Sequence, residues 1–271
     1  MNARIVLNGR EASVDTAGPV SLAVQLEFDG PQPRHFGAPP ASARPFEAPG
    51  FPGTVLRGAS CNCEVISLVP HCNGTHTECV GHLTRERLDA SRVAPLGFLP
   101  ALLVSVAPEP AAATAEDSDP KPRAADLLVT RHALERAWLS ALPFAPRALI
   151  VRTRPNDADK RTRDYSGETP AYLTRQAAAL LVERDIAHLV VDLPSIDRTH
   201  DQGRLTAHRI FFGLPPGSSA LGEAARPAAT ITELAFVPDE VPDGACLLEI
   251  QVPALGGDAV PSRPLLYRLS S

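Results

Sequence analysis

Hydrophobic positions along the chain fall mainly into short runs rich in β-branched residues, the pattern of buried strands. Apolar residues at helical spacing predict helices over 130–142, 175–184 and 207–212, the first two beginning after the N-cap residues Thr130 and Thr174. The apolar runs predict strands over 20–28, 63–69, 99–106, 148–153, 186–192, 231–234, 244–252 and 263–269. Strand, helix and strand follow one another after residue 148, which predicts an α/β fold whose sheet has parallel members.

The length of the chain favours one domain. A chain of 271 residues, 44% of them hydrophobic, can bury a full core and is short for two domains. We therefore predict a single α/β domain over residues 1–271. Residues 108–125 lack an apolar period and contain repeated prolines, which predicts an exposed, mobile insertion. A long irregular stretch also follows the first strand. Phe36, Phe46 and Phe51 are expected to anchor it to the core, and the alternative is an apolar wall or a dimer contact around the site.

Composition narrows the class of function. The net charge is −5 and no run of Lys or Arg occurs, so nucleic acid is not an expected partner. No apolar stretch is long enough for a signal sequence core or a membrane span, which predicts a cytoplasmic protein with no membrane partner. In that compartment the five cysteines are expected to be reduced thiols or metal ligands rather than disulfides.

The densest chemistry in the chain lies between His71 and His82. These twelve residues carry three histidines, two cysteines and one glutamate. Residues two apart face the same side of an extended segment, so His76 and Glu78 can share one site. Convergent titratable groups of these types predict a metal centre or an acid/base site.

The spacing of this cluster resembles the His-x-Gly-Thr-His-x-Asp-x-Pro-x-His signature of the bacterial kynurenine formamidases and cyclase-like metal hydrolases. The matching residues are Gly74, Thr75, His76 and His82. Three positions depart from the signature: Cys72 replaces the first histidine, with His71 beside it, Glu78 replaces the aspartate, and Val80 replaces the proline. Thiolate and imidazole both bind zinc, so either His71 or Cys72 can supply the first ligand.

Two later stretches resemble the same family. The turn from Asp192 to Asp197 is similar to an Asp-x-x-Ser-x-Asp turn that precedes a helix with a metal-binding histidine, which here is His208. A distal glutamate on a strand follows in the family, and Glu233 stands in that context. His200, in a polar turn, is a rival to His208.

The resemblance implies a mixed, barrel-like β-sheet core flanked by helices, of the swivelling β/β/α type. It also implies a homodimer or homotetramer and an arylformamide substrate such as N-formylkynurenine, hence tryptophan catabolism. A divalent metal, Zn or Mn, as one ion or two, would supply hydroxide for hydrolysis of an amide, formamide or lactone, with His82 as the proton shuttle. The predicted ligands are Cys72 (or His71), His76, Glu78, His208 and Glu233.

Other interpretations of the same residues stay open. One is a structural zinc module, and another is a family member without catalytic activity. A third is a thiol nucleophile, Cys79, paired with His82. Arg152 and Arg154 end a predicted strand, where they can bind a substrate or form part of a solvated, charged surface. The structural zinc module would use Cys61, Cys63, Cys72 and Cys79.

Overall fold

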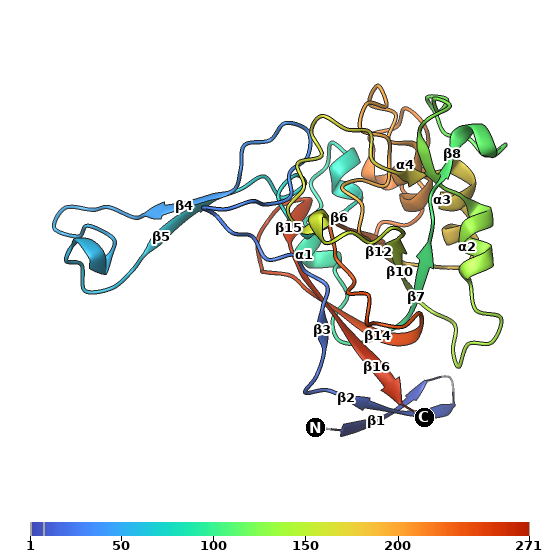
Figure 1. The fold of residues 1–271 in the computed structure, drawn as a ribbon, viewed down its shortest axis with the longest axis horizontal. Helices are drawn as coiled ribbons and strands as arrows, with labels where there is room; N and C mark the ends of the chain where they lie inside the picture. Colours follow the sequence, from blue (N-terminus) through green and yellow to red (C-terminus); the bar gives the residue numbers. More distant parts are fainter. Residues whose placement is uncertain (1, 8, 271) are drawn as a thin grey trace.

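A mixed sheet of eleven strands forms the centre of the computed structural model, which describes residues 2–7 and 9–270 (Figure 1). Its four central strands run parallel to one another in the order β7 (Leu99–Val106), β10 (Ala148–Thr153), β12 (His188–Val191) and β13 (Thr230–Glu233). Beyond β13 the sheet continues with antiparallel β6 (His76–Cys79) and β15 (Ala259–Pro261). Beyond β7 it continues through β14 (Gly244–Gln251), β16 (Arg263–Ser270), β2 (Arg10–Asp15) and β1 (Asn2–Leu7), with β3 (Val20–Ser21) also paired to β16. The predicted α/β fold with a mixed sheet is confirmed.

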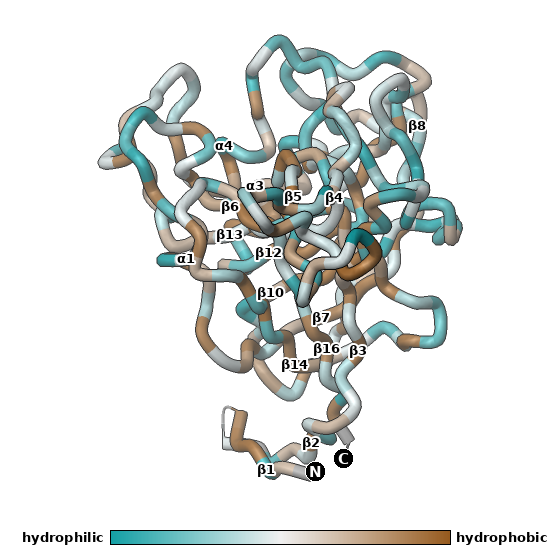
Figure 2. Tube along the Cα trace, turned by 90° about the vertical axis from the view of Figure 1, so that its left-hand side faces the viewer, coloured by the Kyte–Doolittle hydropathy of each residue, from teal (hydrophilic) through white to brown (hydrophobic). Residues whose placement is uncertain are grey.

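Both faces of the central strands are buried. All six residues of β10 are buried, which explains why the strand is an almost unbroken apolar run. Alternate residues Leu149 and Val151 pack on the helical face, whereas Ala148 and Ile150 pack on the other. Hydrophobic residues accordingly concentrate along the strands in the interior of the molecule (Figure 2).

Few helices accompany this sheet. The longest, α3 (Arg175–Glu183), packs against α2 (Arg131–Ala137) and α4 (Thr206–Phe212) (Figure 1). It has nine residues, so none of the helices in the described part of the chain could cross a membrane. A short α1 (Ala90–Val93) and five 3-10 turns complete the helical elements of this part. The turns are η1 (Val55–Arg57), η2 (Val80–Leu83), η3 (Ala111–Ala113), η4 (Ala158–Arg161) and η5 (Leu221–Glu223).

The predicted N-caps of α2 and α3 are confirmed. The hydroxyl of Thr130 accepts a hydrogen bond from the Ala133 N–H at 3.0 Å, and the hydroxyl of Thr174 accepts one from Ala177 at 2.9 Å. Helix α2 ends at Ala137 instead of residue 142. The chain leaves the helix at Trp138, which has an extended conformation with φ −71° and ψ 122°.

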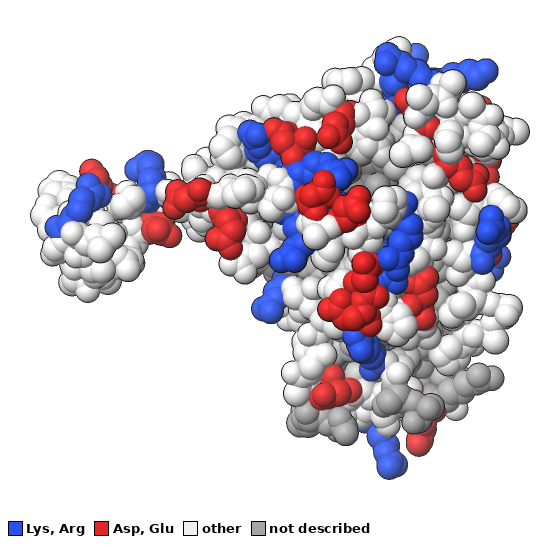
Figure 3. All heavy atoms as spheres, in the orientation of Figure 1, with Lys and Arg blue, Asp and Glu red and all other residues white. Residues whose placement is uncertain are grey.

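The region before the metal-ligand motif differs most from prediction. The strand predicted over 63–69 is present as β5 (Glu64–Ser67), but it pairs only with β4 (Ser42–Pro45), in a ribbon that projects from the body (Figures 1 and 3). Phe46 on this ribbon is 46% exposed, and Phe36 nearby is 56% exposed. The prediction that these two rings anchor the loop to the core is therefore wrong, because neither is covered by the body.

The first strand is also shorter than predicted, since the chain leaves the sheet after β3. It then runs over the metal-ligand motif, where the Val24 N–H donates to the hydroxyl of Thr75 at 2.8 Å. In place of further strand pairing over 20–28, this segment therefore contacts the metal-ligand motif.

Residues 108–125 contain elements that the sequence did not predict. Strand β8 (Glu109–Pro110) pairs with β9 (Leu127–Val129), which in turn pairs with β11 (Tyr172–Leu173). The carboxylate of Glu116 accepts hydrogen bonds from the N–H groups of Arg131 and His132, at the positive end of α2. These contacts order parts of the segment, although Ser118 is its only buried residue among those described.

The buried His188 on β12 has a structural role, and its pKa gives the protein a pH-dependent stability. The ring is buried and bonds the Thr230 hydroxyl, and burial followed by repulsion from Arg147 and Arg226 lowers its pKa from 6.5 to about 4. Between pH 6.5 and 4 the unfolded chain binds more protons at this residue, so His188 makes stability fall as the pH falls.

We expect His188→Gln to lose less stability than wild type between pH 7 and pH 5 in urea unfolding. The exposed His132→Gln serves as the control. An equal pH-dependent loss in His188→Gln and wild type would contradict the assignment.

Candidate metal centre

Four of the predicted ligands converge in one buried cluster. His76 and Glu78 lie on β6, Glu233 ends β13, and His208 lies on α4. The antiparallel register places Glu233 directly opposite His76, with 3.4 Å between Glu233 Oε2 and His76 Nε2. His208 Nε2 lies 2.8 Å from Glu78 Oε1 and 3.6 Å from Glu233 Oε1. The structure thus brings together side chains that are separated by more than 150 residues.

The loop before β6 aims its ligands through tight packing. Gly74 has a φ of 73°, a conformation that favours glycine, and a Cβ there would lie 2.8 Å from the Leu26 side chain. The Thr75 hydroxyl donates to the Leu234 carbonyl at 2.6 Å and so ties the loop to the end of β13. The turn at Gly74 and the hydrogen bond of Thr75 together fix the position of His76.

Asp197 orients His208. Its carboxylate accepts hydrogen bonds from the N–H groups of Ala207 and His208 at the start of α4, and from His208 Nδ1 at 2.7 Å. This leaves His208 Nε2 facing the two glutamates. Asp197 thus gives the predicted Asp192–Asp197 turn a physical role next to the histidine.

The cluster is buried and yet carries an excess of negative charge. Burial disfavours a charged imidazole, yet the carboxylates of Glu78 and Asp197 raise the pKa of His208 well above its usual range. Buried His76 Nε2 and Glu78 Oε1 have no aligned hydrogen-bonding partner among the described residues. Because buried polar atoms are normally paired, these two atoms and the local charge fit a bound divalent cation.

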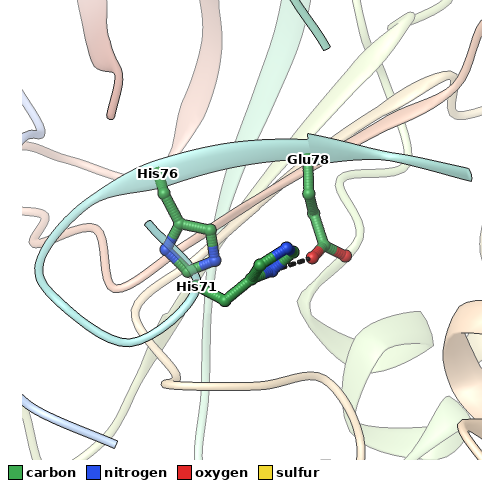
Figure 4. Close-up of side chains that lie close together, drawn as sticks. All are labelled: His71, His76 and Glu78. Atoms are coloured by element: carbon green, nitrogen blue, oxygen red, sulfur yellow. Dashed lines mark ion pairs between the residues drawn. The ribbon is translucent and has the colours of Figure 1, made fainter. Parts of the chain in front are cut away.

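His71 rather than Cys72 reaches this cluster. His71 Nδ1 lies 2.9 Å from Glu78 Oε2, and Figure 4 shows the His71 ring between His76 and Glu78. Among the described residues, three groups of potential ligands have atoms within 4.8 Å of one another, and Cys72 belongs to none of them. Burial and the nearby Glu233 raise the pKa of the Cys72 thiol, which disfavours the thiolate that a metal requires. The geometry therefore favours the histidine for the position that the sequence left open.

Asp258 is part of the site, although sequence analysis did not identify it. Its Oδ2 lies 2.7 Å from His71 Nε2 and 3.3 Å from His82 Nδ1, and the two rings stack with centroids 4.1 Å apart. Hydrogen bonds from both histidines hold the pKa of Asp258 well below its usual range. The only sequence signal was an acidic residue after two glycines, just before a closing strand.

His35 is a second residue that sequence analysis missed. Its ring is 1% exposed, and neither ring nitrogen has a hydrogen-bonding partner among the described residues. Burial, then repulsion from His200 and His76, lowers its pKa to about 4. The backbone N–H of His35 donates to the Cys72 carbonyl at 3.1 Å, so the ring lies on the loop that covers the ligand motif.

The cysteine-based alternatives lose support. Cys61 and Cys63 are exposed near the end of the β4–β5 ribbon, whereas Cys72 and Cys79 are buried, so the four thiols do not form a zinc site. The Cys79 thiol donates to the Leu88 carbonyl, and burial raises its pKa to about 11. A thiol with such a pKa is a poor nucleophile at neutral pH.

Three further candidates lie outside the cluster. His200 is exposed and belongs to none of the ligand groups found among the described residues. Arg152 is buried and donates to Ser105, Asp243 and backbone carbonyls, so its role is structural. Arg154, which pairs with Asp239 and is partly exposed, belongs to the charged surface.

Comparison with known proteins places the chain in a family. Residues 20–198, about two thirds of the chain, match the model of the Cyclase family, described as "Putative cyclase". A comparison with curated protein sequences finds no match.

Solved structures share the whole fold at low sequence identity. A potential metal-dependent hydrolase with cyclase activity is 16% identical, with a TM-score of 0.60 over 92% of this chain and 97% of that one. An isatin hydrolase bound to the product analogue thioisatinate is 15% identical, with a TM-score of 0.59 over 93% and 92%. A predicted metal-dependent hydrolase from Bacillus stearothermophilus is 15% identical, with a TM-score of 0.57 over 92% and 98%.

The cluster predicts a metal dependence that variants can test. We expect purified protein loaded with zinc to lose most of its metal on His76→Ala, because one buried ligand is removed. Cys61→Ser, the matched control on the ribbon, should retain the metal of wild type by elemental analysis. Loss of metal in Cys61→Ser, or retention in His76→Ala, would contradict the assignment.

Replacing the unpaired His35 ring is expected to stabilise the fold. Phenylalanine has a similar shape and leaves no buried nitrogen unpaired, so His35→Phe should raise the free energy of unfolding by about 1 kcal/mol. Urea denaturation at pH 7 measures the change, with the exposed His132→Phe as the control. A loss of stability specific to His35→Phe would show that the ring has a partner in the folded protein.

Proposed function

Because the chain belongs to the cyclase family, we propose that it is a metal-dependent hydrolase of an amide, formamide or lactone bond. The observation that carries this proposal is the buried convergence of His76, Glu78, His208 and Glu233. A buried cluster with two carboxylates is costly without a cation, and no packing role for it is evident. Its place in the fold supports a reactive site rather than a purely structural one.

The donor set fits a divalent metal. Imidazole nitrogens and carboxylate oxygens are ligands that zinc and manganese accept. When bound, such an ion supplies Lewis acidity and makes hydroxide available near neutral pH. The two oxygens of Glu78 face different partners, His208 and His71, so this carboxylate is placed to bridge two ions as well as to bind one.

His82 is proposed to move the proton. Its Nδ1 faces Asp258, which leaves Nε2 as the ring nitrogen that can give a proton to a leaving amine or alkoxide. The side chain is 29% exposed, and its ring centroid lies 5.9 Å from that of His208. It therefore touches both the metal-ligand cluster and solvent, as a proton shuttle requires.

An arylformamide is the first substrate class that we propose, as for the family that the motif resembles. The isatin hydrolase with the same fold supports cyclic amides as a second class. Tryptophan catabolism, a cytoplasmic location and assembly into a homodimer or homotetramer are further parts of the proposal.

A panel of formanilides, cyclic imides and lactones tests the activity. We expect zinc- or manganese-loaded wild type to hydrolyse at least one class, and Glu78→Gln to lose activity together with metal. His82→Asn should retain the metal and lower kcat by roughly 100-fold or more, because general acid catalysis is lost. His132→Asn, an exposed histidine on α2, is the control.

Two results would contradict the proposal. One is wild type that binds the metal yet hydrolyses no member of the panel. The other is His82→Asn with the kcat of wild type, which would remove His82 from the reaction while leaving the metal centre in place.

A further inference from the structure

A single carboxylate oxygen joins the two partly exposed histidines of the site. Asp258 Oδ2 lies within 3.3 Å of His82 Nδ1 and within 2.7 Å of His71 Nε2. The aspartate comes from the loop before β15, whereas both histidines belong to the ligand motif. This contact therefore connects the loop before β15 to His82, the proposed proton shuttle.

The backbone around Asp258 is held on both sides. Its carbonyl accepts a hydrogen bond from the Cys79 N–H at 3.0 Å, which ties it to the end of β6. The preceding Gly257 donates to Asp89 Oδ1 at 3.0 Å, and its carbonyl accepts from Ala90 at 2.7 Å. The carboxylate is thus placed before any substrate arrives.

An imidazole in this position needs such a partner. A neutral ring carries its proton on either nitrogen, and an acceptor at Nδ1 selects the form in which Nδ1 is the donor. The lone pair of the remaining nitrogen, Nε2, can then accept a proton, and it points in a fixed direction. His82 is 29% exposed, so without Asp258 its ring would keep only the ring contacts with His71 and His208 among the described residues.

We propose that Asp258 is a positioning residue, which holds His82 with Nδ1–H toward the carboxylate and Nε2 toward the metal-ligand cluster. This inference rests on the proposed function, in which His82 moves the proton. Asp258 is not assigned contact with the substrate. A side chain that orients a catalytic or metal-binding imidazole commonly contributes 10- to 100-fold to activity.

Two substitutions at Asp258 separate orientation from charge. In the zinc-loaded protein, Asp258→Ala should lower kcat by about 10- to 100-fold with KM within about twofold, because the chemical step loses its oriented shuttle. Asp258→Asn should restore most of kcat, since its amide oxygen can still accept from Nδ1. Asp157→Ala is the matched control, because Asp157 is exposed and its side chain makes no capping hydrogen bond to η4.

A readout without turnover distinguishes this inference from the proposed function. Nitrogen-15 spectra of the histidine rings in zinc-loaded protein should show His82 with Nδ1 protonated in wild type and Asp258→Asn, but not in Asp258→Ala. If wild type shows this form and hydrolyses nothing, the positioning role stands and the proposed function fails.

Three results would overturn the positioning role. The first is an unchanged His82 tautomer in Asp258→Ala. The second is an Asp258→Asn variant that keeps His82 Nδ1 protonated yet is as slow as Asp258→Ala, which would show that the charge of Asp258 matters and not the orientation of His82. The third is loss of one zinc equivalent in Asp258→Ala at saturating metal, because His71, His82 and Asp258 would then form a cation site of their own.

Discussion

The antiparallel pairing of β6 with β13 is the constraint on which the site depends. It sets Glu233 opposite His76, and the hydroxyls of Thr77 and Thr232, 2.7 Å apart, fall in the same register on the next pair of residues. A shift of one residue would turn every side chain of β6 to the other face of the sheet. The ligands would then separate, whatever the quality of the rest of the fold.

Electrostatics explains why this pairing tolerates so much buried charge. Glu78 and Glu233 are almost fully buried, and no Lys or Arg neutralises either one among the described ion pairs. Histidines are their only cationic partners there, and Asp197 adds a further carboxylate behind His208. Carboxylates taken out of water require compensation, which a divalent cation provides better than a shared proton. The buried carboxylates therefore link the fold to the proposed chemistry, because both depend on a cation bound among them.

Sequence reasoning identified the residues that carry short-range patterns. The β-branched runs located the central strands, and the motif spacing located His76, Glu78 and His82. It could not decide between His71 and Cys72, because the order of residues in a loop does not determine which side chain turns inward. The position of the His71 ring, beside Glu78, favours His71.

Features that depend on distant contacts escaped prediction. Asp258 and His35 matter only because strands and loops far apart in the chain bring them to the motif. Apolar periodicity also shows which residues share a face, but not whether anything covers that face, so it did not reveal that the strand over 63–69 lies on the exposed β4–β5 ribbon. In the 108–125 segment, Glu116 bonds the start of α2 through residues at least 15 positions away, which composition alone does not reveal.

X-ray absorption spectroscopy of the zinc-loaded protein identifies the atoms that bind the metal. We predict a metal surrounded only by nitrogen and oxygen at about 2.0–2.2 Å, with the outer-shell scattering that histidine rings produce. A sulfur ligand at about 2.3 Å would contradict this prediction and indicate Cys72 as the ligand. A metal with no histidine scattering would show that the buried cluster does not bind it.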